Sequence, residues 1–102
     1  MTLLGIGEDG HTASLFPGHP GLEEKDHWAL AVIGAKSEAR ITLTYPALDS
    51  SRDLAFLATG AEKRGVVARA QAGDRTLPAT NVHPTGTLHW FTDRAANPTE
   101  TP

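Results

Sequence analysis

The chain has 102 residues, of which 39% are hydrophobic and 21% are charged, and its formal net charge is −3. This is the size and composition of one globular domain, and the negative charge argues against nucleic acid or an anionic membrane as the main partner. The absence of cysteine excludes disulfides and zinc–thiolate sites, and the absence of a long apolar stretch or a basic leader predicts a cytoplasmic protein with no membrane span.

Apolar and β-branched runs alternate with helix-like segments along the chain. Strands are predicted at residues 2–7, 28–33, 40–44, 54–58 and 88–92, and helices at 45–49 and 60–72. Two prolines and two glycines at 17–21 allow at most one or two helical turns after the first strand. The remaining segments are predicted to be a linker, a turn and a flexible tail, at 77–79, 93–96 and 97–102. This alternation is typical of an α/β fold with a mainly parallel, Rossmann-like sheet flanked by helices.

Three glycines follow the first strand with the G-x-G-x-x-G spacing of dinucleotide-binding proteins, at Gly5, Gly7 and Gly10. That fingerprint needs a long helix to carry the pyrophosphate, whereas Pro17 stops any helix early and two carboxylates occupy the turn. The context therefore excludes NAD binding. The histidines of the chain also lack the helical spacing of metal ligands, so we expect no cofactor and no metal.

The same turn carries a carboxylate and an imidazole two residues apart. Asp9 is placed to orient His11, and a histidine of near-neutral pKa is the usual general base. A simpler interpretation is a turn whose Asp9 caps the short helix that follows. The sequence Asp9-Gly10-His11 alone does not decide between these two interpretations.

The run from Leu3 to Gly18 closely resembles the signature of the glucosamine-6-phosphate isomerase/6-phosphogluconolactonase family. Shorter resemblances follow at residues 40–44, 59–63, 77–79 and 88–90. The resemblance implies hydrolysis of 6-phosphoglucono-δ-lactone to 6-phosphogluconate, in the pentose phosphate pathway, without metal or organic cofactor. It implies that His11 is the base that activates water and that Asp9 orients it. Gly7 and Gly10 would let the backbone approach the substrate, with backbone N–H groups around Gly10 and His11 as the expected oxyanion donors.

One position separates the two branches of this family. The isomerase (deaminase) branch carries an acidic residue just before the proline, as part of its proton-transfer machinery. Here Phe16 precedes Pro17, and an aromatic ring cannot move protons. The lactonase branch is therefore favoured over the isomerase.

The resemblance also implies a phosphate site at Lys63 and Arg40. Lys63 is expected in the first turn of a helix, where free N–H groups favour an anion, and the guanidinium fork of Arg40 suits phosphate oxygens. Each has a simpler explanation: Thr59 and Glu62 have the spacing of a capping box, and Arg40 could be a solvated strand end.

Chains of this family are considerably longer, and the present sequence resembles their C-terminal half. We expect residues 1–96 to be part of a larger three-layer sugar-phosphate lactonase/isomerase domain, with 97–102 as a tail. Two outcomes stay open. The chain is a lactonase half that works with a complementing N-terminal half or in a homo-oligomer, or it is a non-catalytic sugar-phosphate-binding module.

Overall fold

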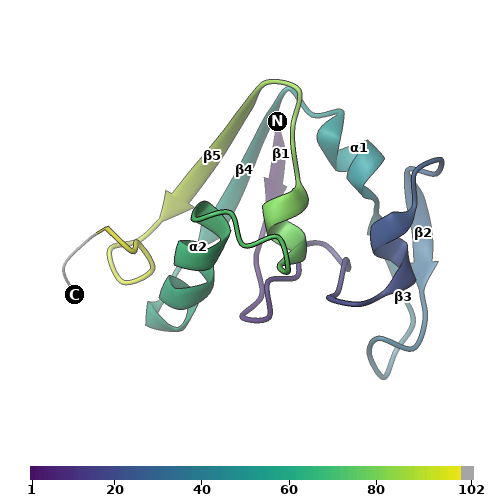
Figure 1. The fold of residues 1–102 in the computed structure, drawn as a ribbon, viewed down its shortest axis with the longest axis horizontal. Coiled ribbons are helices and arrows are strands. Elements are labelled where there is room, and N and C mark those ends of the chain that lie inside the picture. Colours follow the sequence, from purple (N-terminus) through teal and green to yellow (C-terminus); the bar gives the residue numbers. More distant parts are fainter. Residues whose placement is uncertain (100–102) are drawn as a thin grey trace.

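The computed structural model describes residues 1–99, in which a three-stranded parallel sheet stands beside a separate hairpin (Figure 1). The parallel sheet has the order β1 (Thr2–Leu4), β4 (Asp53–Ala58) and β5 (Thr87–Thr92). Leu4, Phe56 and Trp90 share one register level across the three strands. The prediction of an α/β fold with a parallel sheet is confirmed.

The second sheet is an antiparallel hairpin of β2 (Ala29–Val32) and β3 (Arg40–Leu43), which lies at the right of Figure 1. These two predicted strands therefore lie outside the parallel sheet. The reason is the connection between them: residues 33–39 are too few for the crossover of about a dozen residues that parallel strands need, whereas a hairpin needs only a short loop.

The helices are short and close to the predicted positions. α1 spans Tyr45–Asp49, and the predicted helix at 60–72 consists of a 3₁₀ turn, η2 (Ala61–Lys63), followed by α2 (Arg64–Gln71). Two further 3₁₀ turns are η1 (Pro20–Glu23) and η3 (Pro78–Asn81), so the segment interpreted as a linker is partly helical. None of the helices in residues 1–99 has the length and apolar character that a bilayer crossing requires.

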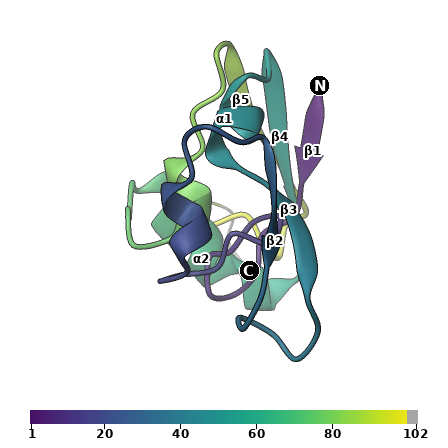
Figure 2. The same ribbon diagram turned by 90° about the vertical axis from the view of Figure 1, so that its right-hand side faces the viewer.

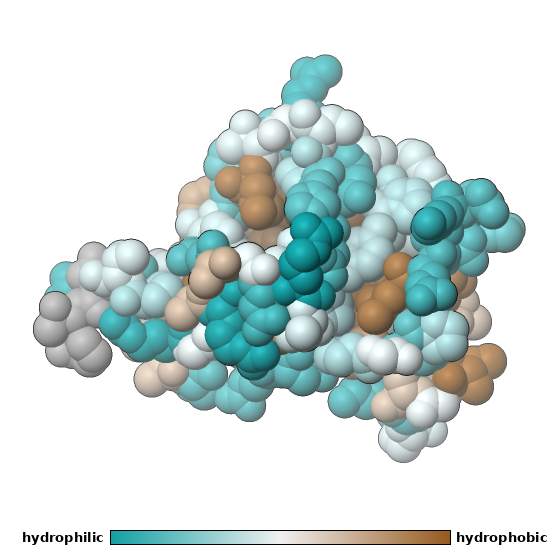
Figure 3. All heavy atoms as spheres, in the orientation of Figure 1, coloured by the Kyte–Doolittle hydropathy of each residue, from teal (hydrophilic) through white to brown (hydrophobic). Residues whose placement is uncertain are grey.

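The core lies on one face of the parallel sheet. Leu54 and Phe56 of β4 are fully buried against Val67 of α2 and the segment around η3, which Figure 2 shows on the same side of the sheet. The opposite face is open in residues 1–99, where the apolar side chains of Leu3 and Leu57 stay 60% and 46% exposed. On the covered side, hydrophilic side chains predominate at the surface and hydrophobic ones form separate small patches (Figure 3).

Candidate active site

The segment after β1 folds as a closed turn rather than as a helix. The N–H of Gly7 donates to the carbonyl of His11 and the N–H of Gly10 to that of Gly7, both at 2.9 Å. Thr12, which is buried, donates its hydroxyl to the carbonyl of Gly5 at 2.8 Å. No helical turn forms between β1 and Pro17, so the alternative in which Asp9 caps a short helix is wrong, because the turn satisfies these backbone groups locally.

Asp9 instead binds His11 twice. Its Oδ1 accepts the backbone N–H of His11 at 3.0 Å and lies 2.5 Å from the ring Nδ1. Partial burial raises the pKa of Asp9, but the hydrogen bonds from the backbone and ring of His11 outweigh it and hold the pKa below its usual value. An ionised Asp9 fixes the imidazole proton on Nδ1, which leaves the lone pair of His11 on Nε2.

Two residues enclose the ring of His11. A Cβ atom at Gly7 would overlap Cε1 and Nδ1 of that ring, so only glycine admits the histidine at this distance from the backbone. On another side, the Phe16 ring lies 4.8 Å from the His11 ring, centroid to centroid, at 39°. The imidazole is thus held by a carboxylate, by the main chain and by an aromatic ring.

Gly10 joins this turn to η3. It has φ +87, and a Cβ atom there would come within 2.6 Å of Cδ2 of Leu77. Its carbonyl accepts the N–H of Ala79 at 2.9 Å. The turn that carries Asp9 and His11 therefore rests on Leu77 and η3.

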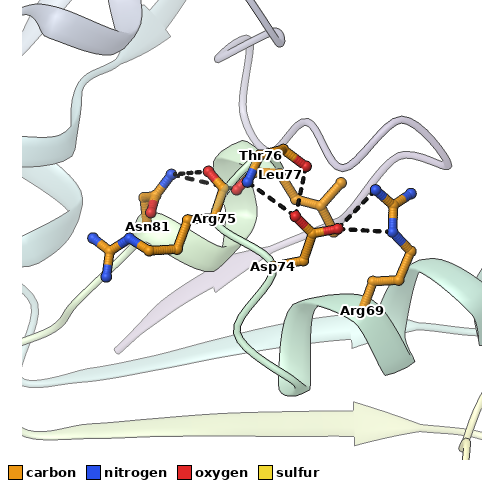
Figure 4. A network of polar contacts seen from close by, with 6 residues as sticks. All are labelled: Arg69, Asp74, Arg75, Thr76, Leu77 and Asn81. Atoms are coloured by element: carbon orange, nitrogen blue, oxygen red, sulfur yellow. Dashed lines mark hydrogen bonds and ion pairs between the residues drawn. The ribbon is translucent and has the colours of Figure 1, made fainter.

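Leu77 is held in turn by the polar network of Figure 4. Asp74 accepts the N–H of Thr76 at 3.0 Å and pairs with Arg69 of α2 at 2.7 Å. Asn81 donates its amide to the carbonyl of Arg75 at 3.0 Å. This network connects the end of α2 to η3 and so fixes the residues beneath the turn.

Lys63, the last residue of η2, lies at the same site although it is 57 residues from Ile6 along the chain. It lines a hollow of about 390 Å³ at the end of β1, together with His11, Gly7 and Thr12. Its Nζ donates to the carbonyl of Ile6 at 2.5 Å. Of the predicted site residues, the structure thus brings His11, Lys63 and Gly7 together in one hollow.

Residues 1–90 match the sequence profile described as "Glucosamine-6-phosphate isomerases/6-phosphogluconolactonase". The chain belongs to this family. It is 45% identical over 101 residues to 6-phosphogluconolactonase of Rattus norvegicus and 42% identical to that of Homo sapiens, in each case over 94% of this chain and 39% of the relative. The crystal structure of 6-phosphogluconolactonase from Thermotoga maritima superposes with a TM-score of 0.76 at 34% identity, over 88% of this chain and 41% of that one. The chain therefore spans about 39% of the length of the curated relatives.

Two expectations are wrong: the capping box read from the residue spacing, and the oxyanion donors that the family resemblance implied. Thr59 and Glu62 form no capping box: Gly60 is the residue before η2, no side chain caps the turn, and the N–H of Gly60 donates to both oxygens of Asp93 at 3.2 Å. The N–H groups of Gly10 and His11 are not free for an oxyanion, because both already donate within the turn. The contact between Gly60 and Asp93 could not have been predicted from a local pattern, because the two residues are 33 positions apart along the chain.

Arg40 does not share the hollow of Lys63. It begins β3, and its Nη2 and Nε donate to Oε1 of Glu38 at 2.7 and 3.1 Å. Its guanidinium lies 5.8 Å from the centre of the Phe16 ring. Of the two predicted phosphate-binding cations, the structure therefore places Lys63 in the hollow with His11 and Arg40 over the ring of Phe16.

A second cation at the Phe16 ring, Lys36, was not expected from the sequence. The Nζ of Lys36 lies 5.0 Å from the centre of the Phe16 ring, and Lys36 lines a second hollow of about 470 Å³ with Asp9 and Phe16. A lysine in a hairpin loop has no periodicity or motif to mark it. In residues 1–99, no three side chains of the metal-ligating types gather closely enough to hold an ion.

Proposed function

We propose that this chain carries the base of a 6-phosphogluconolactonase, which hydrolyses 6-phosphoglucono-δ-lactone to 6-phosphogluconate. The observation that carries the proposal is the Asp9–His11 pair, whose short contact at Nδ1 leaves Nε2 available beside the hollow of Lys63. The names of relatives at 42–45% identity support the choice of substrate.

The proposed reaction needs one base and no redox step. Nε2 of His11 takes a proton as a water oxygen attacks C1 of the lactone, and Asp9 stabilises the imidazolium that forms. The tetrahedral intermediate then expels the ring oxygen, which receives a proton from His11 as the C1–O bond breaks. The product is the open-chain carboxylic acid, which ionises at neutral pH.

Lys63 is the phosphate-binding residue that we assign first. Its ammonium has three N–H donors, of which one is directed at Ile6, so others remain for phosphate oxygens. Arg40 would contribute only after its guanidinium exchanges Glu38 for phosphate. The hollow of Lys63 and His11 therefore sets the orientation of the substrate, with the lactone carbon next to the imidazole.

A sugar-phosphate-binding module without catalysis is the second candidate, because the hollow of Lys63 can bind a phosphorylated sugar whether or not His11 acts as a base. We propose that a complementing polypeptide, with the rest of the family domain, or a second copy of this chain would complete the pocket. An isomerase is disfavoured, because the apolar Phe16 stands where that branch of the family needs an acid.

The test follows three substrates in parallel: the phosphorylated lactone, its unphosphorylated analogue glucono-δ-lactone, and glucosamine-6-phosphate. We expect hydrolysis above the spontaneous rate for the phosphorylated lactone only, by the chain alone or with the remaining part of a full-length relative added. Lys63→Gln should raise KM, with Lys25→Gln as the matched exposed lysine. Binding of 6-phosphogluconate without hydrolysis in either mixture would favour the second candidate, and conversion of glucosamine-6-phosphate would refute the lactonase.

A further inference from the structure

We infer that Phe16 is the positioning residue of His11 and that the hairpin β2–β3 holds Phe16 in place. The inference deepens the proposed function, since it concerns the same base. Its central observation is that the imidazole has an aromatic neighbour that belongs to neither β1 nor the turn of Asp9.

The ring of Phe16 is buried, although it belongs to a segment without regular secondary structure. Phe16 is only 4% exposed, and residues 5–19 contain no helix or strand. Its ring is in van der Waals reach of the imidazole, at 4.8 Å between centroids. Because Gly7 leaves no side chain to guide the imidazole, Phe16 supplies the side-chain wall against which His11 rests.

Two cations tie this ring to the hairpin. Lys36 of the β2–β3 loop and Arg40 of β3 lie 5.0 and 5.8 Å from the ring centre, within cation–π range. The segment has another tether to the same hairpin, because the buried N–H of Ser14 donates to the hydroxyl of Thr42 at 2.9 Å. The position of β3 therefore sets the position of Phe16, and Phe16 sets that of His11.

The consequence concerns which nitrogen faces the substrate. Asp9 binds whichever ring nitrogen is presented to it, so a ring rotation that brings Nε2 to Asp9 would remove the base from the hollow. Phe16 opposes such a rotation by filling the space beside the imidazole. Loss of the aromatic ring should therefore change the orientation of His11 while leaving Asp9 and the fold intact.

The experiment is NMR of the chain labelled with ¹⁵N in histidine, which reads the protonation of each ring nitrogen at neutral pH. Wild type should show His11 with its proton on Nδ1. Phe16→Leu should shift both His11 nitrogen signals toward the mixed values of a free imidazole, and Phe16→Tyr should retain the wild-type values. Phe91→Leu is the matched control, because Phe91 is 53% exposed on the other face of the sheet.

A second variant keeps the test decisive if Phe16→Leu does not fold, as judged by circular dichroism. Lys36→Gln removes one of the two cations at the ring and leaves Arg40. We expect a smaller shift of the His11 signals in the same direction, with none in Lys25→Gln. Wild-type His11 signals in both Phe16→Leu and Lys36→Gln would overturn the inference, and so would wild-type signals in Lys36→Gln alone if Phe16→Leu is unfolded.

Kinetics supply an independent readout. A base displaced by about 1 Å loses on the order of 10²-fold in rate, so Phe16→Leu should lower kcat about tenfold or more with little change in KM. An unchanged kcat would contradict the inference. If wild type hydrolyses no lactone, the proposed function fails, but the NMR comparison still decides the role of Phe16.

Discussion

The position of His11 depends on the absence of a side chain at Gly7 as much as on the presence of the Asp9 carboxylate. Asp9 supplies the hydrogen bonds that orient His11, and Gly7 supplies the space that the ring occupies. At the scale of single residues, both conditions can be tested by small changes.

Gly7→Ala should abolish most of the activity. Its Cβ would overlap the imidazole and approach Oδ1 of Asp9 to 2.9 Å, so the ring must leave its position. We expect a loss on the order of 10²-fold in kcat. Gly65→Ala in α2 is the matched control, because a Cβ at Gly65 meets no atom within 4 Å and Gly65 does not line the hollow. Equal rates for both variants would contradict the proposed geometry.

Asp9 should make the stability of the chain depend on pH in a defined direction. Because its folded pKa lies below the usual 3.8, the contact with His11 contributes above that pH and is lost as pH falls through the lower folded value. The side chain is 47% exposed, so solvent screening keeps the contribution to about 1 kcal/mol or less. Urea unfolding at several pH values should show Asp9→Asn less stable than wild type at pH 7 and equal to it near pH 2. A difference that persists at the lowest pH would count against this account.

At the scale of elements, the turn of the site and η3 form one unit. Gly10 has φ +87 and faces Leu77, and the network around Asp74 and Asn81 holds Leu77 in place (Figure 4). This unit joins segments that are more than sixty residues apart, which is why no local pattern indicates it.

A double-mutant cycle tests this unit. Gly10→Ala should cost more stability than Gly18→Ala, because both glycines have positive φ but only Gly10 has Leu77 within reach of a Cβ atom. Leu77→Ala alone should cost about 2–5 kcal/mol, since Leu77 is buried. Leu77→Ala removes the overlap with Cδ2 and Cγ but keeps the one with Cβ at 2.7 Å, so in this background Gly10→Ala should cost only about 1 kcal/mol less than in wild type. Additive costs in chemical denaturation would show that the two residues are not coupled.

Several elements were predictable because each depends on a local pattern. The uninterrupted apolar run at 54–58 predicted a central parallel strand, and it lies in β4, although the open face of the sheet leaves Leu57 exposed. A helix was expected at 60–72, and α2 forms there with Val66, Val67 and Ala70 buried. Other contacts were not predicted, such as those of Asp93 with Gly60 and of Lys36 with Phe16, because only the folded chain brings these residues together.

At the scale of the whole molecule, the parallel sheet has one covered and one open face in residues 1–99. Neighbouring residues of β4 therefore differ sharply: Phe56 is fully buried, whereas Leu57 is 46% exposed. The contact between Asp9 and His11 was expected from their spacing, but the absence of Arg40 from the hollow of Lys63 was not, because it depends on where the hairpin lies relative to the sheet.

Substitutions on the two faces should differ in cost. Phe56→Ala should destabilise the chain by about 3–5 kcal/mol, since it leaves a cavity in the core. Phe91→Ala on the open face should cost about 0.5 kcal/mol or less. Thermal or urea unfolding of the two variants gives the comparison. A large cost for Phe91→Ala would indicate that this face is covered in solution, for example by a second copy of the chain.

The most direct measurement for the central claim is the rate of 6-phosphoglucono-δ-lactone hydrolysis by His11→Asn, with the spontaneous rate subtracted and under the conditions in which wild type is active. Asparagine can still hydrogen-bond Asp9 but cannot accept the proton, so we predict a loss of about 10²-fold or more in kcat. His83→Asn, an exposed histidine outside the site, should keep the wild-type rate. A His11→Asn variant that hydrolyses the lactone as fast as wild type would contradict the assignment of His11 as the base.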